Sequence, residues 1–263
     1  MYSFTISRPA TVAEAVNAMN SASDVSALAG GMTLIPTLKM RLANPDALVD
    51  LSHVSELNGI TVTDERVSIG AMTTHGAVAE NADIAAAIPA LAALAGHIGD
   101  PAVRHRGTLG GSVANSDPAA DYPAAVLGLG ATINTTRRSI GADDYFKGLF
   151  ETALDEGELI TSIDFPRVEA CAYQKFAQPA SRYALVGVMV ARTSGGARVA
   201  VTGAGACAFR VPQMEAALNA HWSGAAVSGI SVSADGLNSD IHGSARYRAH
   251  LVTVLAERAI AAT

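Results

Sequence analysis

Residues 106–121 read RGTLGGSVANSDPAAD, and the interpretation of the whole chain starts from this segment. It belongs to a longer stretch, residues 100–121, that has little hydrophobic periodicity and many Gly, Asn, Asp and Pro residues. Because long segments without regular structure inside a domain are usually functional, we expect a binding loop here. The tandem glycines Gly110 and Gly111 have no side chains, so a ligand can approach the main chain closely at this point.

Polar side chains surround these two glycines. Thr108 and Ser112 carry hydroxyls, and the Asn115 amide can both donate and accept hydrogen bonds. The carboxylates of Asp117 and Asp121 can accept hydrogen bonds from sugar-type hydroxyls. The segment therefore predicts a site for a ligand that carries hydroxyl groups.

A second pair of glycines lies in the segment LAGGMTL, residues 28–34, between an expected strand at 25–29 and an expected helical turn at 35–41. Successive N–H groups in such a turn, followed by the first turn of a helix, form a concavity that attracts anions. Two diglycine turns, far apart in sequence and each flanked by Thr or Ser, suit one diphosphate held from both sides. Two unrelated tight turns are the alternative.

A third glycine motif, GAGACA at residues 203–208, has the outline of a dinucleotide-binding fingerprint after an expected strand at 198–202. Too few residues follow it to build a doubly wound nucleotide domain, and Pro212 interrupts the helix that should begin there. No acidic residue ends a second strand about 20 residues further on, where the residue that binds the ribose hydroxyl is expected. We therefore expect a hairpin or a turn at the end of a strand.

The charge of the chain argues against a nucleic-acid-binding protein. Its 263 residues carry 18 basic and 24 acidic side chains, a formal net charge of −6, without a long basic run. Only 16% of the residues are charged. That fraction indicates either a surface that lies partly against a partner or simply an alanine-rich composition.

The two cysteines, Cys171 and Cys207, cannot supply the four ligands of an all-cysteine zinc site or of an iron–sulfur cluster, and we expect small buried apolar residues. Motifs of serine hydrolases and zinc proteases are missing. No apolar stretch is long enough to cross a bilayer, and the N-terminus does not resemble a signal peptide. A cytoplasmic protein without a transmembrane segment is expected.

The sequence predicts an α+β fold in three parts. Residues 1–56 alternate strand and helix, which indicates a small unit with parallel strands. Residues 57–168 predict a hairpin at 59–69, helices at 74–80, 84–95 and 145–150, and strands at 131–135 and 158–165. Residues 169–263 predict an antiparallel sheet of three strands at 172–176, 185–192 and 198–202, helices at 212–220 and 245–260, and a loop at 223–239.

Together these motifs resemble the flavin-binding medium subunit of molybdenum hydroxylases, the family of xanthine oxidase and aerobic carbon monoxide dehydrogenase. The resemblance covers nearly the whole chain. It rests on five pieces in the same order, at residues 4–15, 29–39, 108–121, 157–166 and 175–186. It implies a two-subdomain FAD-binding domain at residues 1–168, with subdomains at about 1–56 and 57–168, and a C-terminal domain at residues 169–263.

The resemblance also implies how an extended FAD is held. The peptide N–H groups of residues 29–34 and 110–112 would bind the diphosphate, and Asp121 would bind ribityl or ribose hydroxyls. Ile98 and Ile160 would make apolar contacts, while Lys175 and Tyr183 would lie at the flavin ring, where a lysine could stabilise negative charge on the reduced ring. The implied binding residues are Ala29, Gly30, Gly31, Met32, Thr33, Leu34, Ile98, Thr108, Gly110, Gly111, Ser112, Asn115, Asp121, Ile160, Lys175 and Tyr183.

By the same resemblance the chain relays electrons and has no catalytic side chain of its own. A small subunit with two [2Fe–2S] clusters would deliver electrons and a large molybdopterin subunit would oxidise the substrate, in a dimer of heterotrimers. A self-contained flavin oxidase and a cofactor-free scaffold are the alternatives. Residues 177–181, AQPAS, carry no charge, unlike some family members, so an electron acceptor other than a nicotinamide dinucleotide is expected. The substrate is not encoded in this chain.

Overall fold

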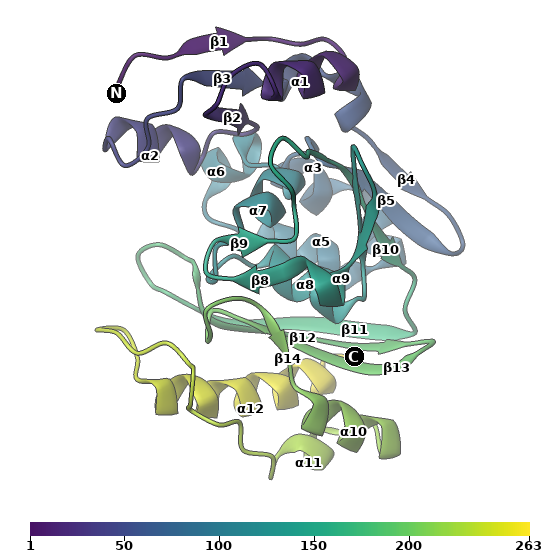
Figure 1. Ribbon diagram of the computed structural model, residues 1–263. Coiled ribbons are helices and arrows are strands. Elements are labelled where there is room, and N and C mark those ends of the chain that lie inside the picture. The colour runs from purple at the N-terminus through teal and green to yellow at the C-terminus, as the bar shows by residue number, and fades with distance from the viewer.

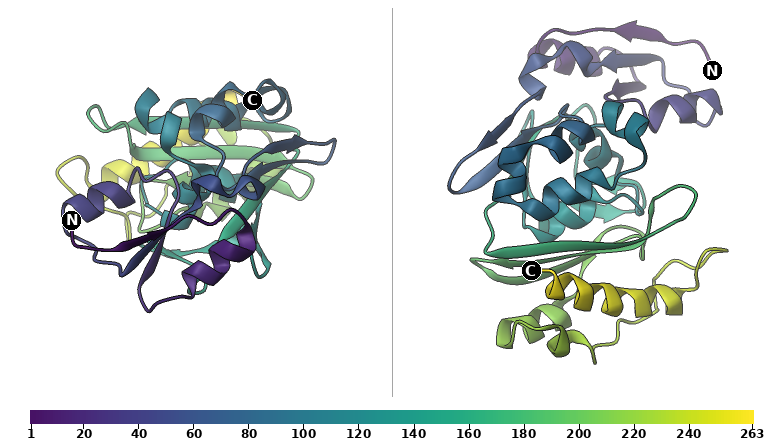
Figure 2. Two further views of the ribbon diagram at one scale, coloured as in Figure 1. Left: turned by 90° about the horizontal axis from the view of Figure 1, so that it is seen from above. Right: turned by 180° about the vertical axis from the view of Figure 1, so that it is seen from behind.

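Three of the four sheets follow one another from the top to the bottom of the molecule in Figure 1, with helices between and around them. The fourth consists of two short strands within residues 146–152. The structure is a computed structural model that describes residues 1–263. The N-terminal segment forms the top layer, the middle of the chain forms the central layers, and the C-terminal segment covers the bottom (Figures 1 and 2).

The top sheet has three parallel strands in the order β1 (Thr5–Ser7), β3 (Ala47–Asp50) and β2 (Val25–Leu28), which confirms the predicted pairing. Helices α1 (Val12–Met19) and α2 (Leu34–Lys39) connect these strands. Thr11 caps α1 by accepting a hydrogen bond from the Glu14 N–H at 3.2 Å, and the Glu14 carboxylate accepts from the Ala10 N–H. Two short 3-10 helices, Leu51–His53 and Ser55–Leu57, lead to the next layer.

The central sheet has five antiparallel strands, and its central strand comes from late in the sequence. The order is β4 (Ile60–Val62), β5 (Arg66–Gly70), β10 (Ile160–Pro166), β6 (Thr132–Thr135) and β7 (Ser139–Gly141). The other elements of this part are α3 (His75–Glu80), α4 (Ala82–Ala87), α5 (Pro89–Gly96), α6 (Pro101–Arg106), α7 (Leu109–Asn115), α8 (Tyr122–Gly128), α9 (Ala142–Tyr145), β8 (Phe146–Gly148) and β9 (Glu151–Thr152). A core of 32 buried residues joins these elements to one face of the third sheet.

Three predictions for the central part were wrong. The expected helix at 84–95 is broken into α4 and α5, because Pro89 disfavours a helical conformation at Ile88. Residues 100–121 are not a long loop: Asp100 and Thr108 cap α6 and α7 with their side chains. The expected helix at 145–150 is instead the end of α9 followed by strand β8.

The third sheet is antiparallel and has the order β11 (Ala170–Ala177), β12 (Ala184–Thr193), β13 (Gly196–Thr202) and β14 (Phe209–Arg210). The three predicted strands are joined by β14, a short edge strand that the sequence analysis missed. Helices α10 (Pro212–Ala220) and α12 (Ala245–Ala261) cover the outer face, and the expected loop at 223–239 contains the short helix α11 (Gly224–Val227). Cys171 and Cys207 are free and only partly buried.

Side chains of this sheet alternate between two cores. Val186, Val188 and Val190 on β12 pack toward the helices of the bottom layer, whereas Met189 and Ala191 pack toward the central layers. On β11 the same alternation sends Tyr173 toward the central layers and Ala172 toward the bottom helices. The third sheet is therefore a shared wall, and its upper face can contribute side chains to the centre of the molecule.

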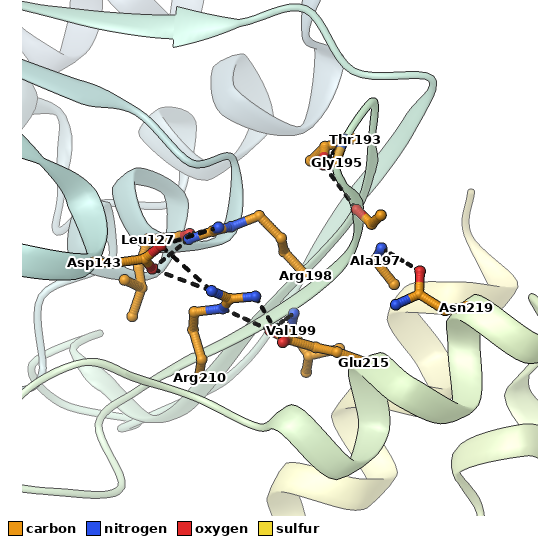
Figure 3. Close-up of polar contacts among 11 residues, drawn as sticks. Leu127, Asp143, Thr193, Gly195, Ala197, Arg198, Val199, Arg210, Glu215 and Asn219 are labelled. Atoms are coloured by element: carbon orange, nitrogen blue, oxygen red, sulfur yellow. Dashed lines mark hydrogen bonds and ion pairs between the residues drawn. The ribbon is translucent and has the colours of Figure 1, made fainter.

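An ion-pair network fastens the third sheet to the central part (Figure 3). Arg198 on β13 donates to the Leu127 carbonyl oxygen at the end of α8 and to the Asp143 carboxylate on α9. Arg210 on β14 also reaches Asp143 and donates two hydrogen bonds to Glu215 at 2.7 and 2.8 Å. Glu215, which is 7% exposed, accepts a third hydrogen bond from the Val199 N–H at 2.9 Å.

We predict that Glu215→Ala lowers the free energy of unfolding by about 1–3 kcal/mol, because a buried N–H group and the Arg210 guanidinium lose their acceptor. Urea unfolding followed by circular dichroism measures this change. Glu169→Ala, at an exposed residue without a side-chain hydrogen bond, is the control and should change stability by less than about 0.5 kcal/mol. Equal effects of the two substitutions would show that the network does not stabilise the fold.

Candidate functional site

A cavity of about 570 Å³ lies between the top layer and the central part. Its walls come from residues 19–34, from 71–121 and from 154–183, so every layer contributes. This volume is within the range of about 300–1,000 Å³ that is usual for pockets that bind small molecules and cofactors. Every binding residue expected from the sequence lines this cavity except Lys175.

The two diglycine turns touch each other at the wall of this cavity. A Cβ atom on Gly30 would lie 2.1 Å from the Arg106 carbonyl oxygen and 2.8 Å from the Gly107 Cα atom, so only glycine fits there. A Cβ atom on Gly111 would lie 3.3 Å from the Ala29 Cβ atom. The two turns, about 80 residues apart in the sequence, therefore face the same cavity from adjoining sides.

The two turns differ in what their peptide N–H groups can still bind. Gly110 donates to the Ala71 carbonyl oxygen, Gly111 to the Thr108 hydroxyl and Ser112 to the Thr108 carbonyl oxygen. These three groups were expected to hold a diphosphate, but each already has an acceptor within the chain, Ala71 for Gly110 and Thr108 for the other two. In contrast, the chain supplies no acceptor for the N–H groups of residues 30–33. The first turn is therefore the free main-chain donor, beside the N-terminus of α2.

Asp121 lies at the cavity wall and is only 4% exposed. One carboxylate oxygen accepts a hydrogen bond from the Tyr173 hydroxyl at 2.5 Å, and the other accepts from the Lys175 ammonium at 2.9 Å. Burial raises the pKa of Asp121, and the Lys175 charge and the two hydrogen bonds oppose this rise. Lys175 thus reaches the cavity through Asp121 and does not line it.

The third sheet makes room for this arrangement. Tyr173 and Lys175 are two residues apart on β11, so both side chains point toward the central part. Gly187 stands opposite Lys175 on β12, and a Cβ atom there would lie 2.2 Å from the Tyr173 hydroxyl oxygen. A side chain at position 187 would therefore displace the hydroxyl that holds Asp121.

The sequence analysis missed His75, which also lines the cavity and is 4% exposed. Its Nδ1 atom is buried and has no hydrogen-bond partner. Burial, reinforced by the nearby charge of Arg104, lowers the pKa of His75 to about 4, so the imidazole is neutral at physiological pH. In the sequence, His75 follows the helix cap Thr74 and belongs to no metal-binding or catalytic motif. Its place at the cavity could therefore be recognised only from the tertiary structure.

Glu158 is a second cavity residue whose buried environment the sequence did not reveal, since it predicted only the start of a strand at 158–165. Its carboxylate is buried and accepts hydrogen bonds from Arg138, from the Thr135 hydroxyl and from the Asp155 N–H. Burial alone would raise the pKa of Glu158, but the hydrogen bonds and the Arg138 charge outweigh it and lower the pKa to about 2. Glu158 therefore anchors the turn before β10.

The chain contains no group of three or more His, Cys, Asp or Glu residues placed to hold a metal ion. No helix is both long and apolar enough to span a bilayer. The polar groups at the cavity are instead free N–H donors, hydroxyls, a neutral imidazole, the buried carboxylates of Asp121 and Glu158, and the half-buried carboxylate of Asp117. This donor set suits an extended cofactor with an anionic centre and sugar hydroxyls.

Solved structures share this fold over almost its full length. The chain superposes on carbon monoxide dehydrogenase from Hydrogenophaga pseudoflava with a TM-score of 0.90 and 34% identity, covering 98% of this chain and 96% of that one. It superposes on quinoline 2-oxidoreductase from Pseudomonas putida 86 with a TM-score of 0.90 and 31% identity, covering 99% of this chain and 96% of that one. Fold and site together define an α+β subunit of an oxidoreductase.

Sequence comparison identifies the family. Residues 2–168 match the FAD-binding domain in molybdopterin dehydrogenase. The chain is 35% identical to the nicotine 6-hydroxylase medium subunit of Paenarthrobacter nicotinovorans, over 96% of this chain and 94% of that one. It is 38% identical to the carbon monoxide dehydrogenase medium chain of Afipia carboxidovorans, over 74% of this chain and 71% of that one. The chain belongs to this FAD-binding family of molybdopterin dehydrogenases, which confirms the resemblance, the fold class and the expected cofactor.

We predict that Gly30→Ala weakens FAD binding at least about 10-fold, because overpacking of about 1–3 kcal/mol would push the two turns apart. The flavin-to-protein absorbance ratio after gel filtration measures the loss. Gly141→Ala is the matched control, since a Cβ atom there meets nothing within 4 Å. Full flavin content in Gly30→Ala would contradict the importance of this contact.

A second prediction concerns acid stability. Because the pKa of Glu158 is about 2 in the folded chain and 4.5 when unperturbed, the stability it contributes is present above pH 4.5 and lost as the pH falls toward 2. Glu158→Gln should therefore be less stable than the wild type at pH 7, and the difference should shrink below pH 4.5. Urea unfolding at several pH values tests this, with Glu156→Gln as the exposed control. A constant difference across the pH range would refute the assignment.

Proposed function

We propose that this chain is the electron-relay subunit of a molybdenum-dependent dehydrogenase or hydroxylase. It holds FAD between a small subunit with two [2Fe–2S] clusters and an external electron acceptor, while a large molybdopterin subunit oxidises the substrate. FAD, when bound, supplies a carrier that exchanges electrons one or two at a time. The chain itself contributes binding, orientation and control of charge around the cofactor.

One observation carries this proposal: residues 30–33, whose peptide N–H groups have no acceptor within the chain, line a cavity whose wall tolerates no side chain at Gly30. A diphosphate is the part of FAD that such donors would hold, aided by the N-terminus of α2. Thr108, Ser112 and Asn115 lie on the adjoining wall and would hydrogen-bond to the cofactor through their side chains. The second turn would then contribute mainly the space left by its glycines, because the N–H groups of residues 110–112 already donate hydrogen bonds within the chain.

The remaining cavity residues divide between polar and apolar roles. Asp121, fixed by Tyr173 and Lys175, would accept hydrogen bonds from the ribityl or ribose hydroxyls of FAD. Ile98 and Ile160 would cover apolar parts of the cofactor, and the half-exposed Tyr183 would lie beside the flavin ring. The Lys175 charge, shared with Asp121, would influence the electrostatic potential at this end of the cavity.

The proposed division of the chain assigns residues 1–56 and 57–168 to the two FAD-binding subdomains and residues 169–263 to the C-terminal domain. Partner chains would hold the iron–sulfur clusters and the molybdenum, since this chain has only two partly buried cysteines. We further propose a dimer of heterotrimers located in the cytoplasm. Relatives are named as medium subunits of enzymes as different as nicotine 6-hydroxylase and carbon monoxide dehydrogenase, and we propose that the large subunit determines the substrate.

Reconstitution tests the proposed function. The purified chain should be yellow and contain FAD, yet reduce no dye with nicotine, an aldehyde or carbon monoxide as electron donor. Addition of the co-expressed small and large subunits should give dye reduction that depends on FAD in this chain. Dye reduction by the isolated chain with an organic substrate would indicate a self-contained oxidase. A colourless chain that takes up no FAD would indicate a scaffold.

We predict that Asp121→Asn raises the Kd for FAD about 10-fold, since hydrogen bonds to a charged acceptor contribute about 1.5–3 kcal/mol. Tyr173→Phe should have a smaller effect, because it removes one supporting hydrogen bond and leaves the carboxylate in place. Titration of the apoprotein with FAD, followed by flavin fluorescence, measures both values. Asp144→Asn, an exposed neighbour of the Asp143 network, is the control. An unchanged Kd in Asp121→Asn would remove Asp121 from the binding site.

A further inference from the structure

A second cavity, of about 370 Å³, adjoins the cofactor cavity at one end. The two cavities share Gly99 and Arg182, and the second one lies beside α6, the end of α5 and the loop between β11 and β12. It is lined by Gly96, His97, Gly99, Arg104, Lys175, Ala177 and Arg182. No acidic residue lines it, so its wall is strongly cationic.

The cationic side chains come from three separate elements. Arg104 lies on α6, Lys175 on β11 and Arg182 in the loop that follows β11. Lys175 is neutralised, because it is 2.9 Å from the Asp121 carboxylate. Neither Arg104 nor Arg182 has a carboxylate within ion-pair distance. Two uncompensated guanidinium groups therefore face the same space.

Both arginines are tied to the same short piece of main chain. The Arg104 Nη1 atom donates to the Ile98 carbonyl oxygen at 3.1 Å and to the Gly99 carbonyl oxygen at 3.4 Å. The Arg182 Nη1 atom donates to the Gly99 carbonyl oxygen at 3.4 Å. These contacts use one nitrogen of each guanidinium group, and the other N–H donors remain available to a ligand. The carbonyl oxygens orient the two arginines without neutralising them.

The loop holds Arg182 in a conformation that arginine does not favour. Its φ angle is 62°, in the left-handed region, and the loop is closed by hydrogen bonds from the Gln178 N–H to the Tyr183 carbonyl oxygen and from the Arg182 N–H to the Gln178 carbonyl oxygen. Non-glycine residues held in this region often occur at functional sites. The next residue, Tyr183, lines the cofactor cavity. The loop thus links the two cavities.

We propose that this second cavity binds an anionic group, of the carboxylate, sulfonate or phosphate type, on the molecule that takes electrons from the bound cofactor. Arg104 and Arg182 would bind its oxygen atoms, because charge-assisted hydrogen bonds from guanidinium groups suit oxyanions. An anion there would also relieve the repulsion between the two arginines. The inference rests on the proposed function, since it takes the Ile98–Tyr183 end of the cofactor cavity as the flavin end. The acceptor would then be anionic although residues 177–181 carry no charge.

Direct binding tests the cavity with a redox-inert probe, naphthalene-2-sulfonate, titrated calorimetrically into the FAD-loaded chain at low ionic strength. We expect Arg104→Gln and Arg182→Gln each to raise the Kd of this probe about 10-fold. Arg104→Lys should restore much of the affinity, because it keeps the charge. Arg258→Gln removes one charge from an exposed position on α12 that lines neither cavity, and it should leave the Kd unchanged.

Two results of this titration would overturn the proposal. One is an unchanged Kd in both Arg104→Gln and Arg182→Gln, with circular dichroism and flavin absorbance showing that the variants are folded. The other is binding of the probe only when FAD is absent, which would make the second cavity part of the FAD site. A wild-type chain that takes up no FAD contradicts the proposed function. A chain that holds FAD but does not bind the probe contradicts this inference alone.

A pair of acceptors tests the link to electron transfer. The reduced, FAD-loaded chain is mixed with 1,4-naphthoquinone-2-sulfonate or with uncharged 1,4-naphthoquinone, each of which takes up two electrons and two protons to become the hydroquinone. The ratio of the two rate constants, sulfonated over neutral, should fall about 10-fold in the arginine variants. The ratio should remain at the wild-type value in Arg258→Gln. An unchanged ratio in variants that have lost probe binding would overturn the assignment of this cavity to the acceptor.

Discussion

The contact between Gly30 and the main chain of Arg106 and Gly107 is the constraint on which the site depends. It brings two turns from different layers so close that any side chain at Gly30 would collide with a carbonyl oxygen. The turn after β2 is thereby fixed at the cavity wall while its own N–H groups remain without acceptors. A binding site made of peptide groups needs this rigidity, because free N–H donors bind an anion well only when they are already in position. The separate folding of the two layers would not produce such a site.

The third sheet holds a side chain of the cavity in position, as the contact at Gly30 holds the main chain. Tyr173 and Lys175 leave β11 on one face and hold both oxygens of Asp121, while Gly187 on the neighbouring strand leaves space for the tyrosine hydroxyl. The Arg198–Asp143–Arg210 network fixes that sheet against α8 and α9, so Asp121 is supported by a wall that cannot shift freely (Figure 3). A subunit that only relays electrons needs such positioning, and it requires no nucleophile or general base.

Charge is distributed unevenly around the cofactor cavity. Buried or paired groups such as Glu158, Asp121 and Lys175 are neutralised within the chain, and His75 is held uncharged by burial and by Arg104. Asp117, Arg104 and Arg182 form no ion pair, and the two arginines gather at one end, around Gly99. The local sequence around residue 180 did not suggest this concentration, because one of the two arginines comes from α6. In the proposed function, main-chain groups would retain the cofactor, whereas the charges of the two arginines would favour an anionic acceptor.

The sequence by itself determined the diglycine turns, the parallel N-terminal unit and the three long antiparallel strands, since these features depend on residue type and local periodicity. The family followed from the resemblance of five motifs in the same order along the chain. It misjudged residues 100–121, where caps at Asp100 and Thr108 start two helices too short to show an apolar period. Only the tertiary structure decided which N–H groups remain free, which carboxylates are neutralised, and that His75, Arg104 and Tyr173 stand near the site. Those properties depend on contacts between segments 52 to 83 residues apart, and residue types and local spacing carry no information about which distant groups will meet.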